Sequence, residues 1–321
     1  MAPLPYPGAE IVLGSPKSAW TFHASSGFDL SRKPSTPHKP IPRFWLRTST
    51  EPITLDPGKT ALVTVDLQNY FLSCALGHHL GPLHIAENNI RTLAVPAARK
   101  AGIQVVHLTW GFSAAEAKVA PPAILRRFSP FFEELGGRSG GGCRRSTCSS
   151  KSTHHPDAPA VHSTLGDELG PVTLWNDQIV LAGSKLIRGT WNADLYEPTR
   201  RVFVESADTD VPDARFYKTR ASGFFSDGSG VPDIVKFLRG KGITTLLMGG
   251  VKAEEGVWAS ARDAANWGFD VVLLGDGCGT LAGEYVSKTL ENSCESELGF
   301  VSTCAEFSKG VASLMKGLGA T

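Results

Sequence analysis

Two residues with reactive side chains and one glycine turn lie at the ends of expected strands. Asp66 ends one apolar run and Lys218 ends another, while Gly256 lies in the turn 249–257. Because the carboxyl ends of parallel strands meet at one edge of a sheet, we expect these three positions to lie together. A semi-buried carboxyl group beside an ammonium is suited to giving and taking protons. The sequence therefore predicts acid–base chemistry.

The turn that holds Gly256 lies between a strand pattern and a helix pattern. Residues 243–248 form an apolar, β-branched run, Gly249 and Gly250 follow, and residues 253–267 have helical periodicity. A helix that starts directly after a strand points its free N–H groups at the carboxyl edge of the sheet. We expect the N–H groups near Gly256 to hold a carbonyl, a carboxylate or a developing oxyanion.

Alternating strand and helix patterns predict how these residues are positioned. The strands are expected at 60–66, 103–108, 214–218, 243–248, 269–274 and 299–303. Helices are expected at 86–101, 231–241 and 253–267. This order predicts an α/β protein, a three-layer α/β/α domain with a six-stranded, mostly parallel, Rossmann-like sheet.

Two segments fall outside this pattern. Residues 1–50 are rich in proline and aromatic residues and predict an extended N-terminal arm that wraps the core or a neighbouring subunit, ahead of an α/β domain at 51–321. Residues from about 136 to 164 predict a low-complexity, mobile loop insertion. This insertion contains two cysteines and two histidines: Cys143, Cys148, His154 and His155. Their spacing fits no standard zinc site, so we expect no metal.

Composition excludes several classes of partner. The 321 residues carry a formal net charge of +1, which gives no electrostatic case for nucleic acid or an anionic membrane. Apolar runs fall far short of the ~20 residues of a membrane helix, and no signal peptide is expected. The 6 cysteines do not form a disulfide framework, so we expect reduced thiols and a cytoplasmic protein.

Three motifs resemble the isochorismatase-like hydrolase superfamily, which includes nicotinamidases, N-carbamoyl amidohydrolases and isochorismatases. They lie at 63–71, 217–224 and 250–264, and the resemblance covers roughly residues 50–310. The resemblance implies a six-stranded parallel sheet and a catalytic aspartate, lysine and cysteine. Asp66 and Lys218 match the first two.

The third catalytic position departs from the usual pattern. Most of the superfamily has Gly-Val-x-Thr-x-x-Cys-Val in this turn, whereas this chain has Gly256 at the cysteine position. Thioester chemistry therefore cannot run through this position. The isochorismatases proper also carry glycine there, and in them the aspartate protonates the enol carbon of a vinyl ether before water completes the cleavage. The superfamily also implies a cis peptide after Val251.

Further residues are expected to bind the substrate. Aromatic side chains near the strand ends are candidates for an apolar pocket, although each fits a core position equally well. The full set is Gln68, Phe71, Trp110, Trp191, Phe224, Phe225, Val251, Lys252 and Glu255. We expect no cofactor.

The leading hypothesis is a homo-oligomeric enzyme of secondary metabolism that acts on a small cyclic or unsaturated metabolite. Asp66 and Lys218 would hydrolyse a vinyl ether or a related C–O or C–N bond without a cysteine. One alternative is a lyase, isomerase or cyclase on the same scaffold, and another is a catalytically silent protein that binds a ligand or partner. A third is amide or ester hydrolysis through water activated by Asp66, or through Cys74.

Overall fold

The computed structural model describes residues 10–15, 18–32, 42–129 and 164–319. Its centre is a six-stranded sheet in the order β10-β7-β6-β11-β12-β13, in which every neighbouring pair is parallel. The strands are β6 (Thr60–Val65), β7 (Gln104–Trp110), β10 (Ala214–Lys218), β11 (Thr245–Val251), β12 (Asp270–Gly279) and β13 (Gly299–Ser302). The predicted α/β fold class is confirmed.

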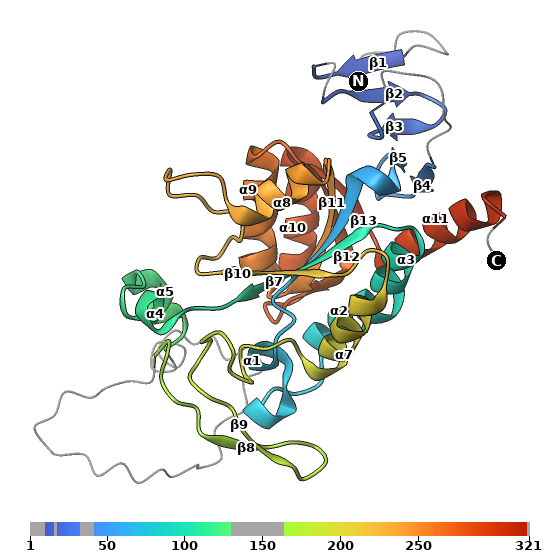
Figure 1. The fold of residues 1–321 in the computed structure, drawn as a ribbon. Helices are drawn as coiled ribbons and strands as arrows, with labels where there is room; N and C mark the ends of the chain where they lie inside the picture. The colour runs from blue at the N-terminus through green and yellow to red at the C-terminus, as the bar shows by residue number, and fades with distance from the viewer. Residues whose placement is uncertain (1–9, 16–17, 33–41, 130–163, 320–321) are drawn as a thin grey trace, which may run out of the picture.

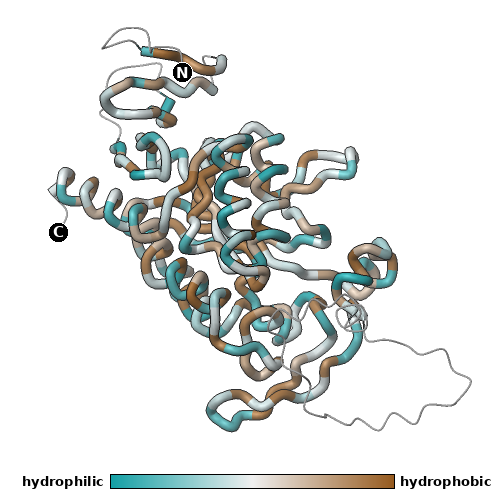
Figure 2. The backbone as a smooth tube through the Cα atoms, turned by 180° about the vertical axis from the view of Figure 1, so that it is seen from behind, coloured by the Kyte–Doolittle hydropathy of each residue, from teal (hydrophilic) through white to brown (hydrophobic). Residues whose placement is uncertain are grey.

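The central strands are buried along their whole length. Every residue of β6, β7 and β11 is buried, which explains why these strands appear in the sequence as continuous apolar runs. Figure 2 shows hydrophobic residues concentrated in the middle of the molecule and hydrophilic residues along the outer helices. No helix in the described ranges is both long enough and apolar enough to span a membrane.

Helices cover both faces of this sheet, which gives the three predicted layers (Figure 1). One face packs against α8 (Asp233–Gly240), α9 (Trp258–Asn266) and α10 (Glu284–Glu297). The other packs against α2 (Pro82–Asn89), η3 (Ile90–Ala94), α3 (Val95–Lys100) and α11 (Cys304–Gly317). The segments α2, η3 and α3 follow one another without a break, so the helix predicted at 86–101 begins earlier, at Pro82.

The strand order places the site. From the central β6, the chain adds β7 and β10 on one side and later β11, β12 and β13 on the other. The reversal falls between β6 and β11, and ligands of open α/β sheets bind at such a point, outside the carboxyl ends of the strands. Asp66 directly follows β6, and residues 252–257 directly follow β11.

The last predicted turn of this sheet is instead part of a strand. The glycines at 275 and 277 predicted an end to the strand, but β12 continues to Gly279 beside β11. A Cβ on Gly279 would lie 2.9 Å from Leu83 Cα, so glycine allows α2 to pack directly on the extended strand. Cys278, four positions beyond the end of the strand predicted at 269–274, therefore lies on β12.

The segment predicted as an extended arm forms a small sheet of its own. It contains β1 (Glu10–Leu13), β2 (Trp20–His23), β3 (Gly27–Asp29) and β4 (Phe44–Leu46), joined by β5 (Ile53–Leu55) in the order β1-β2-β3-β5-β4. Aromatic residues attach this sheet to the α/β domain, since Trp20 and Phe28 both pack against Phe300. The domain boundary at residue 50 stays a prediction.

The connections at the carboxyl edge complete the described fold. Between β6 and α2 lie α1 (Asn69–Leu72) and η2 (Cys74–Leu76), and after β7 come α4 (Ala114–Lys118) and α5 (Pro122–Arg127). The segment between residue 164 and β10 contains a hairpin, β8 (Pro171–Thr173) with β9 (Ile179–Leu181), and then α7 (Glu197–Glu205). The predicted insertion lies outside the described residues except for Thr164.

Candidate active site

Asp66 lies directly beyond β6, with its backbone turned into the left-handed region at a φ of 60°. Its N–H donates to Leu108 O at 2.9 Å, which ties the turn to the neighbouring strand. The residue is only 2% exposed. Its Oδ1 is buried and accepts no hydrogen bond from the described residues. A buried carboxylate oxygen without a partner is available to a ligand or a water molecule.

Lys218 reaches Asp66 from two strands away. It ends β10, and its Nζ lies 3.0 Å from Asp66 Oδ2 and donates to Ala221 O at 3.1 Å. On the way the ammonium lies 3.8 Å from the ring centroid of Trp110, the last residue of the intervening strand β7. The indole face stabilises the cation in a site from which water is excluded.

Burial shifts both partners of this pair toward neutrality. It raises the pKa of the Asp66 carboxyl above its usual range, although the adjacent Lys218 ammonium opposes the shift. It lowers the pKa of Lys218 to about 8, against the attraction of the Asp66 carboxylate. The two shifts bring the proton affinities of the carboxyl and the amine closer together, so the pair can exchange a proton as a general acid or base requires.

Gly256 directly faces this pair. A Cβ on Gly256 would lie 2.5 Å from Asp66 Oδ2 and 3.3 Å from Lys218 Nζ. Gly256 lies in η5 (Ala253–Val257), which continues into α9. The turn before it uses a left-handed Lys252, with a φ of 54°. The described residues contain no cis peptide, so the cis bond implied after Val251 is absent.

The side chain of Gln68 positions its neighbours and does not face the site. Its side-chain oxygen accepts from the backbone N–H of Trp110 at 2.8 Å. Its side-chain amide nitrogen donates to the backbone carbonyls of Trp110 and Ala193 at 2.8 and 2.7 Å. The side chain is completely buried. These bonds join the ends of β6 and β7, so Gln68 holds Asp66 and Trp110 in place while its own polar atoms face the protein.

The predicted apolar residues separate into two groups. Trp110 lies under the Lys218 ammonium, and the ring of Phe71 lies 6.0 Å from Lys252 Nζ. Val251 is buried at the end of β11, and Trp191 is half-buried with its carbonyl accepting from Asn69. By contrast, Phe224 packs in the core against Phe269, and Phe225 is 46% exposed beside Arg220. The structure brings Trp110 to the acid–base pair but not Phe224.

Arg127 is part of the site and was not predicted from the sequence. It ends α5, its Nη2 donates to Glu255 Oε2, and its guanidinium lies 5.3 Å from the centroid of Trp110. The charges of Arg127 and Glu255 both act on the pKa values of Asp66 and Lys218. Glu255, predicted near the mouth of the site, is therefore one half of an ion pair there.

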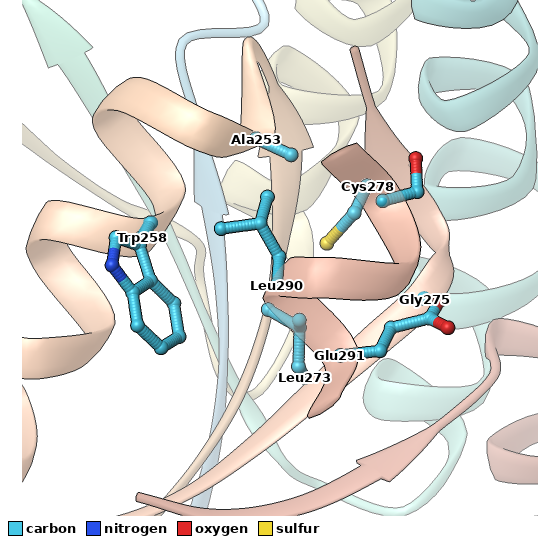
Figure 3. A pocket seen from close by; sticks show the side chains of 8 residues that line it. Ala253, Trp258, Leu273, Gly275, Cys278, Leu290 and Glu291 are labelled. Atoms are coloured by element: carbon cyan, nitrogen blue, oxygen red, sulfur yellow. The ribbon is translucent and has the colours of Figure 1, made fainter. Parts of the chain in front are cut away.

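The cysteines of the described ranges lie elsewhere. Cys74 is exposed in η2. Cys278 borders a small cavity of about 10 Å³ between Trp258, Leu273 and Glu291 (Figure 3). This volume holds no more than one water molecule, so the cavity is not a substrate site. Burial raises the pKa of the Cys278 thiol far above neutral pH, which leaves it protonated and unreactive.

Metal chemistry has no ligand set in the described part of the chain. Its His, Cys, Asp and Glu side chains nowhere gather in a group of three or more suited to a metal ion. The four Cys and His residues of the predicted insertion lie outside the described residues. Two histidines that follow Asp66 in the sequence have backbone partners: His78 Nε2 lies 2.7 Å from Tyr70 O, and His84 Nε2 lies 2.7 Å from Leu72 O.

The site can move protons but presents no thiol at its centre. Asp66 provides an unpaired oxygen, Lys218 provides a cation in contact with the other oxygen, and Gly256 has no side chain that would keep Asp66 Oδ2 away. These groups can protonate a substrate atom, activate water or stabilise negative charge. Covalent cysteine catalysis would need a side chain where Gly256 has none.

Comparison of the sequence with known proteins identifies relatives of this chain. Residues 174–305, which include Lys218 and Gly256, match the family model described as an isochorismatase domain. A ureidoacrylate amidohydrolase, RutB, of Variovorax paradoxus is 28% identical over 285 residues, covering 87% of this chain and 91% of that protein. RutB of Rhizobium rhizogenes is 26% identical over 261 residues, covering 80% and 85%.

A solved structure has the same fold. The cysteine hydrolase from Pseudomonas syringae pv. phaseolicola superimposes with a TM-score of 0.52 at 17% identity, covering 86% of this chain and 99% of that chain. At this identity the likeness concerns the fold alone. Together with the family model and the amidohydrolase relatives, it confirms the predicted resemblance.

Proposed function

We propose that this chain, a hydrolase of the isochorismatase-like superfamily, cleaves a C–O or C–N bond next to a carbon–carbon double bond without a cysteine nucleophile. Asp66 is the general acid and base, and Lys218 controls its charge. One observation carries the proposal: a Cβ on Gly256 would lie 2.5 Å from Asp66 Oδ2. The position opposite the carboxyl holds no thiol, and Asp66 Oδ2 occupies the place that a side chain there would take.

The unpaired Asp66 Oδ1 supports this role. The protonated carboxyl gives its proton to the terminal carbon of the double bond, and the adjacent carbon becomes an oxocarbenium or iminium centre. Water then adds to this centre and returns a proton to the Asp66 carboxylate. The C–O or C–N bond then breaks as the proton of the new hydroxyl passes to the departing oxygen or nitrogen, which leaves a carbonyl group. Lys218, 3.0 Å from Oδ2, stabilises the carboxylate formed in the first step.

Protonation at carbon serves oxygen and nitrogen leaving groups alike. The amidohydrolase names of the relatives concern an acyl C–N bond. The ureidoacrylate in those names also has a nitrogen attached to a double bond, and it is this vinyl C–N bond that carbon protonation would break. The glycine at position 256 favours the vinyl-ether chemistry that the resemblance to isochorismatases proper implies. We therefore propose a small unsaturated metabolite, of secondary metabolism, as the substrate class.

The test is substrate turnover in D₂O. Vinyl ethers and N-vinyl amides, including ureidoacrylate, are incubated with the enzyme, and the products are examined by NMR. We expect deuterium on the product carbon that was part of the double bond. From N-vinyl amides we also expect the intact amide, which is urea in the case of ureidoacrylate; a carboxylate or carbamate formed from the acyl group would indicate direct attack on its carbonyl and contradict carbon protonation.

The Asp66→Asn variant tests whether Asp66 supplies the proton. We expect a loss of about 10²–10⁴-fold in turnover with an unchanged melting temperature, because asparagine keeps the shape but cannot deliver the proton. Asp233→Asn, which changes an 84% exposed carboxylate on α8, is the matched control. Full turnover in Asp66→Asn would reject the proposal, and no turnover by the wild type would favour a silent ligand-binding protein.

Two further expectations concern the context of the enzyme. We expect a homo-oligomer, since Trp45 of the N-terminal sheet is 52% exposed. We also expect it to work in the cytoplasm, which the four free cysteines of the described ranges support. Sedimentation analysis and fractionation of cells test these two points.

A further inference from the structure

The Arg127–Glu255 ion pair borders the acid–base site but differs from it in exposure. The side chains of Arg127 and Glu255 are 21% and 27% exposed, whereas those of Lys218 and Asp66 are 1% and 2% exposed. Solvent and small solutes can therefore reach the outer pair. The buried inner pair lies behind it, within range of both outer charges.

Two aromatic rings contact the guanidinium of Arg127. Its face lies 5.3 Å from the centroid of Trp110 and 5.8 Å from that of Phe128, which fixes its plane. Within the part of the chain that the structure describes, it donates one hydrogen bond, from Nη2 to Glu255 Oε2. A guanidinium has five N–H donors in a fork that matches a carboxylate.

Within the described ranges, the ion pairs that surround Asp66 and Glu255 contain more cations than carboxylates. Lys218, Arg127 and Lys252 face Asp66 and Glu255, and Lys252 Nζ lies 4.0 Å from Glu255 Oε2. The excess grows when Asp66 is protonated, the state in which it acts as an acid. An anionic substrate would compensate this charge at the moment when the proton is needed.

We propose that Arg127 recognises a carboxylate on the substrate, and that Glu255 occupies the place of this carboxylate in the free enzyme. The inference rests on the proposed function and deepens it, because it restricts the substrate to a small unsaturated carboxylic acid. Binding exchanges one carboxylate for another on Arg127. Glu255 keeps Lys252 as an alternative partner, so its displacement leaves no isolated charge.

This exchange predicts opposite effects for the two halves of the ion pair. Arg127→Gln removes the donor fork and should weaken carboxylate binding about tenfold or more. Glu255→Gln removes the internal competitor and should tighten carboxylate binding several-fold. If Glu255 merely positioned Arg127, its loss would weaken binding instead. The direction of the Glu255 effect therefore separates exchange from a structural role.

Calorimetry with matched probes gives the measurement. Propionate and benzoate are titrated into the full-length protein at millimolar concentration, beside the uncharged propionamide and benzamide. We expect only the two carboxylates to respond to Arg127→Gln and Glu255→Gln. Glu284→Gln and Lys288→Gln make the same charge changes in an exposed pair of α10 and should leave both affinities unchanged.

Each result decides the inference. It is overturned by equal responses of carboxylates and amides, by weaker carboxylate binding in Glu255→Gln, or by no carboxylate binding to either wild type or Glu255→Gln. Melting curves of each variant separate lost binding from lost folding. Because binding is measured without turnover, the same titration in Asp66→Asn distinguishes the two proposals: Asp66 can fail as an acid while Arg127 still selects carboxylates.

Discussion

A Cβ on Gly256 would lie 2.5 Å from Asp66 Oδ2, closer than real Cβ contacts allow. The carboxyl and the glycine are therefore fitted to each other, and no side chain at position 256 is compatible with this position of Asp66. A cysteine introduced there would have to displace the carboxylate that activates it. The absence of a thiol at position 256 and the position of the Asp66 carboxyl therefore depend on each other.

Gly256→Ala should damage the site by displacing Asp66. We expect turnover to fall about 10²-fold or more, because a misplacement of about 1 Å has that effect, and stability to fall by about 1–3 kcal/mol. Gly240→Ala is the matched control, since a Cβ there meets nothing within 4 Å. Steady-state kinetics and urea unfolding measure both effects. Equal kinetics for the two variants would show that Asp66 tolerates a neighbour.

The pH dependence of turnover should follow the protonation of Lys218. Burial lowers the pKa of Lys218 to about 8, so kcat/KM should decline as pH rises through this value and the ammonium beside Asp66 is lost. Because the two groups interact strongly, the decline reports the pair as a unit. A pH–rate profile tests this, with Lys236→Gln on the exposed α8 ion pair as the control. A profile that stays flat through pH 8 would contradict it.

The same shift has a consequence for stability. The folded pKa of Lys218 lies below its ordinary value of 10.5, so between about 8 and 10.5 the unfolded chain binds a proton that the folded chain does not. The free energy of unfolding should therefore rise with pH across this window. Urea unfolding of wild type and Lys218→Met at several pH values tests the sign: the rise should be absent from the variant.

Thiol reagents should leave the enzyme active. Burial raises the pKa of the thiols of Cys278 and Cys304, and that of Cys294 to about 12, so these groups stay protonated. Cys74 is exposed, and Cys74→Ser should keep full turnover. Iodoacetamide treatment followed by an activity assay makes the comparison. Lost activity in untreated Cys74→Ser would revive the alternative of a displaced cysteine nucleophile.

The sequence predicts the parts of the site that end buried strands. Asp66 and Lys218 follow apolar runs whose neighbours in the sheet follow from the βαβ order, so their meeting could be anticipated. Arg127 could not be. It ends a helix of 6 residues just before the low-complexity segment, and its partner Glu255 lies 128 positions further along the chain. No local sequence pattern predicts such a contact.

The N-terminal sheet escaped prediction for a related reason. Its strands have 3 or 4 residues each, too few for an alternating pattern to emerge among the prolines. What fixes the sheet is a long-range contact. Asp270, the first residue of β12, accepts from Trp20 Nε1 at 2.8 Å, from Arg32 at 2.5 and 2.7 Å, and from Thr245 Oγ1 at 2.8 Å.

Asp270→Ala should therefore destabilise the protein without touching the chemistry. It leaves the buried Arg32 without its carboxylate, which costs about 3–5 kcal/mol. Turnover per folded molecule should be unchanged, because Asp270 begins β12 at the end of the sheet opposite Asp66. Urea unfolding measures the loss, and Asp233→Ala at the exposed α8 pair should cost less than about 0.5 kcal/mol. Equal stability of the two variants would mean that Asp270 does not anchor the N-terminal sheet.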